Sequence, residues 1–388
     1  MDVGATYMRP PRVPGKIIIP MASLYLHIPY CEKKCIYCDF YSIENMNSME
    51  HFLAALEKEI RMYAERFSQS DAIDTIFFGG GTPSLLPPST MGRILTALHS
   101  NYQIRSDAEI TVETNPGTVD IEKLRGYRSL GVNRLSIGIQ SFHPHELAFL
   151  SRIHTSEEAV QCVENAYRAG FENISVDLIF SLPNQTLGRW NENLRRAIAL
   201  QPKHISAYSL IVEEHTPLFM MVQNKTVSPL PESLDAEIYE STIGMMAEHG
   251  YQQYEISNYA KPDYACRHNL LYWTGGEYLG LGPSAQSYLH GIRFGNIADL
   301  DAYAACLNDD HLPVTDRIIL STSERQRDAL VFGLRLLHGV PRKTIKAAER
   351  DHQIDELIAK GLLDTDHDRV RLTSLGRRYA DTVAEQLF

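Results

Sequence analysis

The first half of the chain alternates between short apolar runs and longer amphipathic stretches, and this alternation restricts the fold more than any other feature. The runs that predict strands are 23–29, 72–78, 108–114, 134–140, 173–183 and 204–212. The stretches that predict helices between them are 48–67, 88–100, 120–131, 155–170 and 186–200. Six consecutive strand–helix units indicate a parallel sheet covered by helices. Right-handed crossovers curve such a sheet into a complete or partial barrel, and six units would leave the barrel open; a doubly wound sheet is the alternative.

Polar residues and glycines gather where the predicted strands end. The ends read Gly79-Gly80-Gly81-Thr82, Glu113-Thr114-Asn115 and Gln140-Ser141, and Asp177 lies inside the fifth strand. In parallel α/β folds the chemistry lies at the carboxyl ends of the strands. We therefore expect these groups to converge on one mouth of the barrel, into which the first strand also leads.

The segment that leaves the first strand is HIPYCEKKCIYCDFYS (27–42), with Cys31, Cys35 and Cys38 in a C-x3-C-x2-C arrangement. Iron–sulfur clusters are held by thiolates, and a 4Fe–4S cube normally has four of them. Three thiolates would hold three corners of a cube and leave the fourth iron open to another ligand, much as a catalytic zinc keeps one open position. Zinc is the alternative, but structural zinc needs a fourth ligand, and His27 lies on the predicted strand.

Bulk properties narrow the class of protein. The other cysteines, Cys162, Cys266 and Cys306, are far apart in a chain of 388 residues, so we expect a metal-binding cluster in a cytoplasmic protein rather than a disulfide scaffold. The formal charge of −11 argues against a broad nucleic-acid surface. No apolar run is long enough for a membrane span or a signal peptide, and residues 1–22 predict a flexible leader. The first strand starts just after Met21, which is an alternative translation start.

Beyond the sixth predicted strand the regular alternation of strands and helices ends. We expect a partial barrel over 23–215 and an extension of it over 216–305, which contains a helix at 235–249 and a strand at 253–260. From about residue 310 the chain is expected to be helical. Its last 30 residues predict helix, strand, Asp-rich turn, strand and helix, so 306–388 predicts a C-terminal winged-helix-like module. Such modules often bind DNA, but the acidity of the chain favours a packing or docking role.

The motifs together resemble the radical S-adenosylmethionine (SAM) family. The segments that carry the resemblance are YLHIPYCEKKCIYCDF, FFGGGTPSLL, ETNPGT, GVNRLSIGIQSF, LSRIHT and SVDLIFSLPNQT. They are most similar to the branch that holds oxygen-independent coproporphyrinogen III dehydrogenases and HemW-type heme chaperones, from about residue 23 through the C-terminal module. The resemblance implies a 4Fe–4S cluster on Cys31, Cys35 and Cys38, with SAM chelating the open iron.

The resemblance also implies a set of SAM-binding residues. They are Tyr25, Tyr37, Gly80, Gly81, Thr82, Glu113, Gln140, Arg152 and Asp177. These residue types suit the task, because glycines allow close approach of the backbone. Glu113 and Asp177 can accept hydrogen bonds from ribose hydroxyls or an ammonium group, and Arg152 can bind a carboxylate.

Two features separate the members of that branch. The dehydrogenase pattern has a further cysteine two residues after the third, where this chain has Phe40, and it has a longer segment before the first strand. The chaperone pattern has H-N-x-x-Y-W, and this chain has His268, Asn269, Tyr272 and Trp273 at those positions. Imidazole is a good axial ligand for heme iron, and the two aromatic rings offer apolar surface to a porphyrin. Cys266 is a second possible ligand, and core packing is the plainer reading of the motif.

We therefore expect a heme chaperone that carries a SAM-coordinated 4Fe–4S cluster, binds heme and transfers it to an acceptor apoprotein. The alternatives are an oxygen-independent coproporphyrinogen III dehydrogenase, another radical SAM oxidoreductase of porphyrin metabolism, or a redox-sensing DNA-binding regulator. Whether SAM is cleaved, so that the protein is an enzyme, stays open, since the cofactor would drive that step. Homodimer formation and docking on a membrane surface also stay open.

Overall fold

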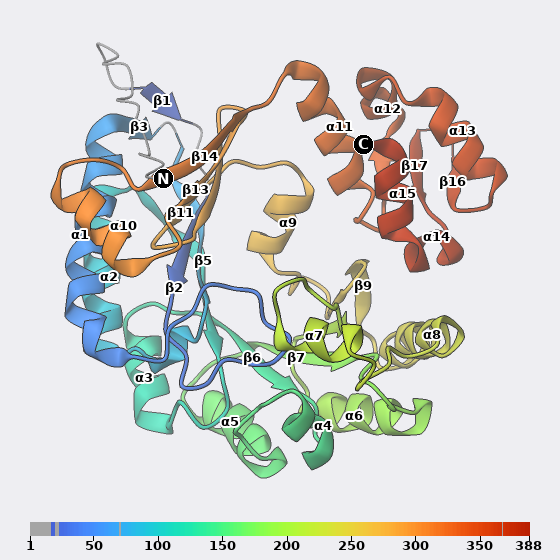
Figure 1. Cartoon of the computed structure of the whole chain (residues 1–388), viewed down its shortest axis with the longest axis horizontal. Coiled ribbons are helices and arrows are strands. Elements are labelled where there is room, and N and C mark those ends of the chain that lie inside the picture. Colours follow the sequence, from blue (N-terminus) through green and yellow to red (C-terminus); the bar gives the residue numbers. More distant parts are fainter. Residues whose placement is uncertain (1–16, 20–22, 70, 367) are drawn as a thin grey trace.

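The computed structural model describes residues 17–19, 23–69, 71–366 and 368–388 (Figure 1). Its centre is a run of six parallel strands that pair in chain order: β2 (Ser23–Ile28), β4 (Ile73–Gly80), β5 (Ile104–Thr114), β6 (Arg134–Gln140), β7 (Asn173–Phe180) and β8 (His204–Ser209). These strands are the core of a 12-stranded sheet. The predicted α/β fold, a partial (βα)6 barrel, is confirmed.

Helices follow the strands at nearly the predicted positions and lie on the outside of the curved sheet (Figure 1). They are α1 (Met49–Arg66), α2 (Pro88–Asn101), α3 (Ile121–Ser129), α5 (Ser156–Arg168), α6 (Leu187–Ala199) and α8 (Glu232–Glu248). Gly131 (φ 96°) and Gly170 (φ 90°) follow α3 and α5 in the left-handed conformation. A side chain there would be strained, which explains why these helices end at glycine.

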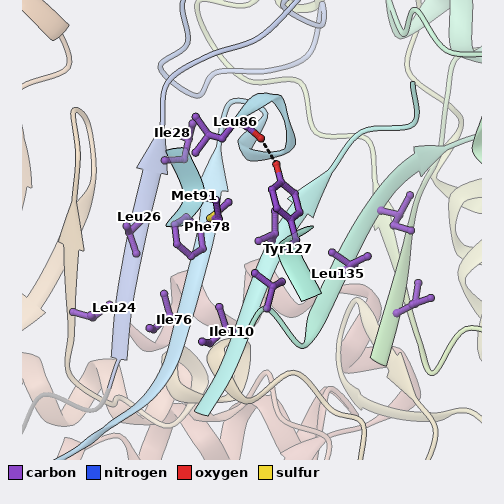
Figure 2. Close-up of a cluster of buried hydrophobic side chains, with 14 of the residues drawn as sticks. Leu24, Leu26, Ile28, Ile76, Phe78, Leu86, Met91, Ile110, Tyr127 and Leu135 are labelled. Carbon is purple, nitrogen blue, oxygen red and sulfur yellow. Dashed lines mark hydrogen bonds between the residues drawn. The ribbon is translucent and has the colours of Figure 1, made fainter. Parts of the chain in front are cut away.

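The outward face of the six strands is apolar and packs against the helices. Figure 2 shows this core, in which alternate residues of β2 (Leu24, Leu26, Ile28) and of β4 (Ile76, Phe78) lie in one layer. Helix α2 contributes Met91, and α3 contributes Tyr127, whose hydroxyl donates to the Leu86 carbonyl. Burial of these side chains supplies the main stabilisation of the barrel, roughly 1.5–3 kcal/mol for each large apolar residue.

The inward face of the same strands is unusually polar. Strand residues alternate between the two faces, so the neighbours of the outward residues point into the barrel. The buried inward positions near the amino ends of the strands are Ser23, Thr75, Glu109, Arg134, Ser175 and His204. Barrel interiors are normally filled with branched apolar side chains. A polar interior therefore indicates a barrel built around a ligand or a buried hydrogen-bond network.

Both edges of the parallel strands are extended by segments from the second half of the chain. On the β2 side lie β11 (Tyr278–Leu281), which is parallel to β2, and then antiparallel β12 (Gln286–Leu289), β13 (Ile292–Asn296) and β14 (Val314–Ile319). On the β8 side lie antiparallel β10 (Asn258–Ala260) and β9 (Gln252–Glu255). The single strand predicted over 253–260 is wrong, because the chain turns back on itself between β9 and β10. The prediction of helix from about residue 310 is also wrong, because β14 still belongs to the sheet.

The C-terminal part has a second hydrophobic core of its own. Its elements are α11 (Thr322–Gly333), β15 (Val340–Pro341), α12 (Arg342–Ala348), α13 (Asp351–Ala359), β16 (Leu363–Thr365), β17 (Arg369–Leu372), α14 (Ser374–Arg378) and α15 (Ala380–Leu387). The β16–β17 hairpin after the helices matches the predicted winged-helix-like order. Arg377 donates to Gln253 at 2.7 Å and Arg378 pairs with Glu240 at 3.2 Å, so this part packs against the barrel edge.

The remaining elements are short or connect these parts. They are β1 (Ile17–Ile19), β3 (Phe67–Gln69), α4 (Pro144–Phe149), α7 (Pro217–Gln223), α9 (Arg267–Trp273), α10 (Leu300–Asn308) and the 3-10 turns Met46–Ser48 and Pro83–Leu85. Most of the predicted leader lies outside the described residues, and its described part, β1, pairs with β3. None of the helices within the described ranges combines the length and apolar character that crossing a membrane requires.

Candidate functional site

The cysteine loop leaves the carboxyl end of β2 and is held to the barrel mouth by backbone hydrogen bonds. Cys31 N donates to Ile43 O at 3.0 Å, and Ile43 N donates to Pro29 O at 2.7 Å, so the loop closes on itself. The imidazole of His27 donates from Nε2 to Tyr41 O at 2.8 Å, which is a third hydrogen bond between β2 and the loop. These hydrogen bonds therefore hold the cysteine loop at the barrel mouth.

Two of the three thiols already have polar contacts, one from the end of β4 and one from the loop between α4 and α5. The hydroxyl of Thr82 donates to Cys31 Sγ at 3.6 Å, and Arg152 Nη1 donates to Cys35 Sγ at 3.7 Å. Burial raises the pKa of the Cys38 thiol to about 11. Because iron binds the thiolate, loading the site must release this proton.

The three thiols fit an iron–sulfur cube better than a single metal ion. All three are half-buried in one loop, and N–H and O–H donors to sulfur are the contacts that tune such clusters. A structural zinc ion would need a fourth protein ligand beside the three thiols. In a cube each thiolate binds a different iron, and the fourth iron is left for a ligand that the protein does not supply.

The glycine-rich end of β4 gives the loop its close contact with the barrel. Gly81 N donates to Ile28 O at 2.8 Å, and a Cβ at Gly81 would lie 2.6 Å from the Tyr30 carbonyl oxygen. Gly80 has φ 104°, and a Cβ there would lie 2.7 Å from the ring of His27. Both positions therefore require glycine, which explains the Gly80–Gly81 pair beside the cysteine loop.

Arg152 and Asn115 form the centre of a cleft beside the cysteine loop. Arg152 Nη2 donates to Asn115 Oδ1 at 2.6 Å and to Gly138 O at 2.7 Å, and Asn115 Nδ2 donates to Thr82 Oγ1 at 3.0 Å. The cleft has about 310 Å³ of empty space, part of it open to solvent, between Cys35 and these residues. Asn115 was expected at the barrel mouth as part of a strand end, but it was not among the predicted SAM-binding residues.

Two carboxyl groups lie deeper in the barrel. Asp177 accepts from Ser136 at 2.7 Å and from Ser175 at 2.9 Å, which fixes its orientation. Burial, and to a smaller extent the charge of Asp177, raises the pKa of Glu113 to about 8, although the Gly80 N–H and Arg134 oppose this. Both carboxyl groups therefore lie in the barrel interior, and their role as acceptors for SAM stays a prediction.

Three other predicted SAM-binding residues are Tyr25, Tyr37 and Gln140. Tyr25 stacks on Phe77, with 6.3 Å between the ring centroids, and burial raises the pKa of the Tyr25 hydroxyl. Tyr37 packs beside Leu150, and burial raises the pKa of its hydroxyl also. Gln140 is left-handed (φ 67°), and its Oε1 is buried without a hydrogen-bond partner in the described part of the chain. Such an unpaired acceptor is available to a cofactor donor.

The predicted heme motif lies at the opposite end of the barrel from the cysteines. It forms α9, and Glu109 caps this helix by accepting from the backbone N–H of Arg267 at 3.2 Å and of His268 at 3.1 Å. His268 Nδ1 lies 2.7 Å from Thr75 Oγ1, near the amino end of β4, and its Nε2 lies 2.9 Å from the Tyr272 hydroxyl.

His268 is fully enclosed, and both of its ring nitrogens have partners. Its ring stacks on Phe77 at 5.0 Å, and burial together with the charge of Arg134 lowers the pKa of the imidazole to about 3. Trp273 packs under Arg335, and Asn269 is half-buried on the same helix. In this structure His268 is therefore not available to heme iron, and its role as a ligand stays a prediction that requires α9 to move.

Comparisons with known proteins agree with this geometry. The family model of the Radical SAM superfamily matches residues 25–197, and that of the HemN C-terminal domain matches residues 320–379. The heme chaperone HemW of Bacillus subtilis is 35% identical over 374 residues, which cover 94% of this chain and 98% of the relative. This chain belongs to the HemW heme chaperone family. The HemW of Escherichia coli is 33% identical over 387 residues, which cover 95% of this chain and 98% of that relative.

The solved structure of coproporphyrinogen III oxidase (HemN) from Escherichia coli, described as a radical SAM enzyme, has the same fold. It superimposes with a TM-score of 0.81 at 24% identity and covers 97% of this chain and 91% of that one. Membership of the radical SAM superfamily implies a 4Fe–4S cluster and SAM in this HemW family member. The three cysteines and the unpaired polar groups beside them suit these cofactors.

Glu113 is expected to make the stability of the barrel depend on pH. Its pKa is raised in the folded state, so folding favours the neutral carboxyl group. Stability is then full below the ordinary glutamate pKa and falls as the pH rises toward 8, by up to about 1.4 kcal/mol per pH unit. Thermal unfolding of Glu113→Gln, measured between pH 5 and 9, is expected to show a flatter profile than the wild type. Glu157→Gln, an exposed change on α5, is the control, and parallel profiles for Glu113→Gln and the wild type would contradict this role.

Proposed function

We propose that this chain binds heme and passes it to an acceptor apoprotein, as the name of its relatives implies. The observation that supports this most directly is similarity to HemW chaperones over nearly the whole chain, including the C-terminal part. The likeness to HemN supports only the shared fold, since that identity is 24%.

Phe40 favours the chaperone over the dehydrogenase. The dehydrogenase pattern has a cysteine at this position, whereas Phe40 is exposed on the cysteine loop. An exposed aromatic ring beside the barrel mouth suits contact with an apolar cargo or partner better than a role in the protein interior.

In this proposal, Cys31, Cys35 and Cys38 hold a 4Fe–4S cluster and the cleft beside them holds SAM. SAM bound there would complete the coordination of the open iron. Arg152 would bind the carboxylate of SAM, and Glu113 and Asp177 would accept hydrogen bonds from its donors. Tyr25, Tyr37, Gly80, Gly81, Thr82 and Gln140 complete the predicted SAM contacts.

The predicted heme contacts at α9 need a rearrangement. Tyr272 and Trp273 would offer their rings to the porphyrin only if α9 left its place under Thr75 and beside α11. The acceptor protein, homodimer formation and membrane docking stay predictions.

The test is heme titration of the anaerobically reconstituted full chain, followed by transfer. We expect a Soret band that saturates with added hemin, and a shift of that band to the spectrum of the acceptor when apomyoglobin is added. A spectrum of free hemin throughout would remove the proposal. Formation of vinyl product from coproporphyrinogen III, with reductant and SAM, would instead support the dehydrogenase.

A further inference from the structure

Helix α9 lies between the barrel and the C-terminal part, and it is held from both sides (Figure 1). On the barrel side, Glu109 caps the helix, and Arg267 pairs with Asp74 at 3.1 Å. On the other side α9 contacts α11, the first helix of the C-terminal part. The helix cannot move away from the barrel without changing this second contact.

Arg335, which follows α11, covers one face of Trp273 on α9. Its guanidinium carbon lies 4.5 Å from the centroid of the indole ring, a distance typical of a cation–π contact. A porphyrin would stack on the same kind of flat aromatic face. The guanidinium therefore occupies apolar surface that the predicted heme motif would offer to a porphyrin.

Glu255, at the end of β9, holds the guanidinium in this position. The side chain of Glu255 is 0% exposed, and its carboxylate lies 3.5 Å from Arg335 Nη2. The backbone beside it is also fixed, because Leu337 N donates to Tyr254 O at 3.1 Å. Arg335 thus joins three segments, namely β9, α9 and the connection that follows α11.

This contact leaves polar atoms buried without a hydrogen bond. Trp273 Nε1 and Arg335 Nε are both buried, and neither has a hydrogen-bond partner among the residues that the structure describes. Buried polar groups in native proteins are nearly always paired, and an unpaired donor lowers the stability of the arrangement that buries it. The contact between Arg335 and Trp273 is therefore one that can open at a small cost.

The C-terminal part is built so that it can move as a unit. It has a hydrophobic core of its own, and Ile256 packs against both this core and that of the barrel. Arg377 and Arg378 add polar contacts to Gln253 and Glu240 at the barrel edge. Parts of a chain that meet through polar contacts of this kind are expected to move relative to one another.

We propose that Arg335 keeps the heme motif on α9 closed, and that displacement of its guanidinium from Trp273 opens the motif to heme. The inference rests on the proposed function, since it concerns the regulation of the heme site of the same chaperone. Heme and the guanidinium compete for one face of Trp273. The affinity for heme is therefore reduced in proportion to the fraction of molecules that are open.

The test is hemin titration of the full reconstituted chain with Arg335→Leu. This change removes the cation and keeps an apolar side chain in its place. We expect the dissociation constant for hemin to fall by about threefold or more, because the closed form loses its cation–π contact. Glu255→Gln is expected to change the constant in the same direction, since it removes the charge that faces Arg335 but keeps an acceptor for the N–H of Ser257.

Arg378→Leu is the matched control. Arg378 belongs to the same part of the chain, and its side chain is 27% exposed, against 28% for Arg335. It pairs with Glu240 on α8 at 3.2 Å and not with α9. Its removal weakens the packing of the C-terminal part without uncovering Trp273, so the affinity for hemin is expected to stay at the wild-type value.

Quenching of tryptophan fluorescence by acrylamide measures the opening without heme. The chain has two tryptophans, and Trp190 is 0% exposed in the barrel core. We expect Trp273 to be quenched more strongly in Arg335→Leu than in the wild type, and Trp273→Phe gives the signal of Trp190 alone. General unfolding would instead increase the quenching of Trp190 as well.

The outcomes are distinguishable. Hemin affinity in Arg335→Leu that equals or falls below that of the wild type overturns the inference and leaves the proposed function intact. An equal gain in Arg378→Leu would also overturn it, because the effect would then come from general loosening of the C-terminal part. Absence of hemin binding by the wild type and by both variants would remove the proposed function itself.

Discussion

Replacing Cys35 with alanine is expected to abolish the brown absorbance of the anaerobically reconstituted protein. A 4Fe–4S cube normally has four protein thiolates, and this loop offers only three. With two left, the cube loses half of its usual ligands, so the iron content should fall from about four per chain toward none. Cys35 also accepts the hydrogen bond from Arg152, so its loss removes the contact between the cluster and the cleft. Iron analysis and the visible spectrum measure the effect.

Cys306→Ala provides the matched control. Cys306 is half-buried like Cys35, but it lies on α10 and donates to Leu312 O at 3.4 Å. Its removal is expected to leave both iron content and colour unchanged. Equal iron content in Cys35→Ala and the wild type would contradict the cluster assignment.

The sequence predicted the barrel well because its periodicity is strong. Most outward strand residues are apolar and the long helices each have a buried side, so the six units could be recognised from local patterns. The boundaries of β6 agree with the prediction, and those of α2 differ by one residue. The cysteine loop was equally clear, since three thiols within eight residues are typical of a metal centre.

The structural features that the sequence did not predict depend on contacts between segments that are distant in the chain. The turn between β9 and β10 lies at Ile256 and Ser257, which carry no glycine or proline to mark it. The environment of His268 depends on Thr75, which is 193 residues away in the chain. No local pattern shows that a histidine in a plausible heme motif will be enclosed from both sides.

One signal in the sequence was available and was not used. Ser23, Tyr25 and His27 alternate with apolar residues on the first strand, and Thr75, Glu109, Arg134 and His204 hold corresponding places on other strands. This alternation predicts a polar barrel interior, because a strand covered by apolar side chains on both faces would show continuous apolar runs. The buried polar side chains inside the barrel follow from that pattern.

Arg134 is the buried positive charge among the inward polar residues of the barrel. It is 1% exposed, and burial alone would oppose its charge, but the nearby Cys266, Glu109 and Asp177 hold its pKa above the ordinary value. Glu109 in turn caps α9. The guanidinium therefore offsets the negative charge that positions the helix closing the barrel.

Replacing Arg134 with methionine is expected to destabilise the barrel by up to about 3–5 kcal/mol, because the buried carboxyl group of Glu109 then loses the opposing charge of the guanidinium. Thermal unfolding by far-ultraviolet circular dichroism measures the change. Arg105→Met, on the neighbouring strand β5, is the control. Arg105 pairs with Asp107 at 2.9 Å but is half exposed, so its loss should cost about 0–1 kcal/mol.

The double variant Arg134→Met, Glu109→Gln separates charge from packing. If the cost comes from an unpaired carboxylate, neutralising Glu109 should recover part of the lost stability, since the amide oxygen can still accept from the α9 backbone. If the cost comes from a lost fit of the guanidinium in the barrel, the two changes should add. An unfolding midpoint for Arg134→Met equal to that of Arg105→Met would show that the buried guanidinium contributes no net charge stabilisation, and that the Glu109 cap and the apolar contacts of α9 hold this helix without it.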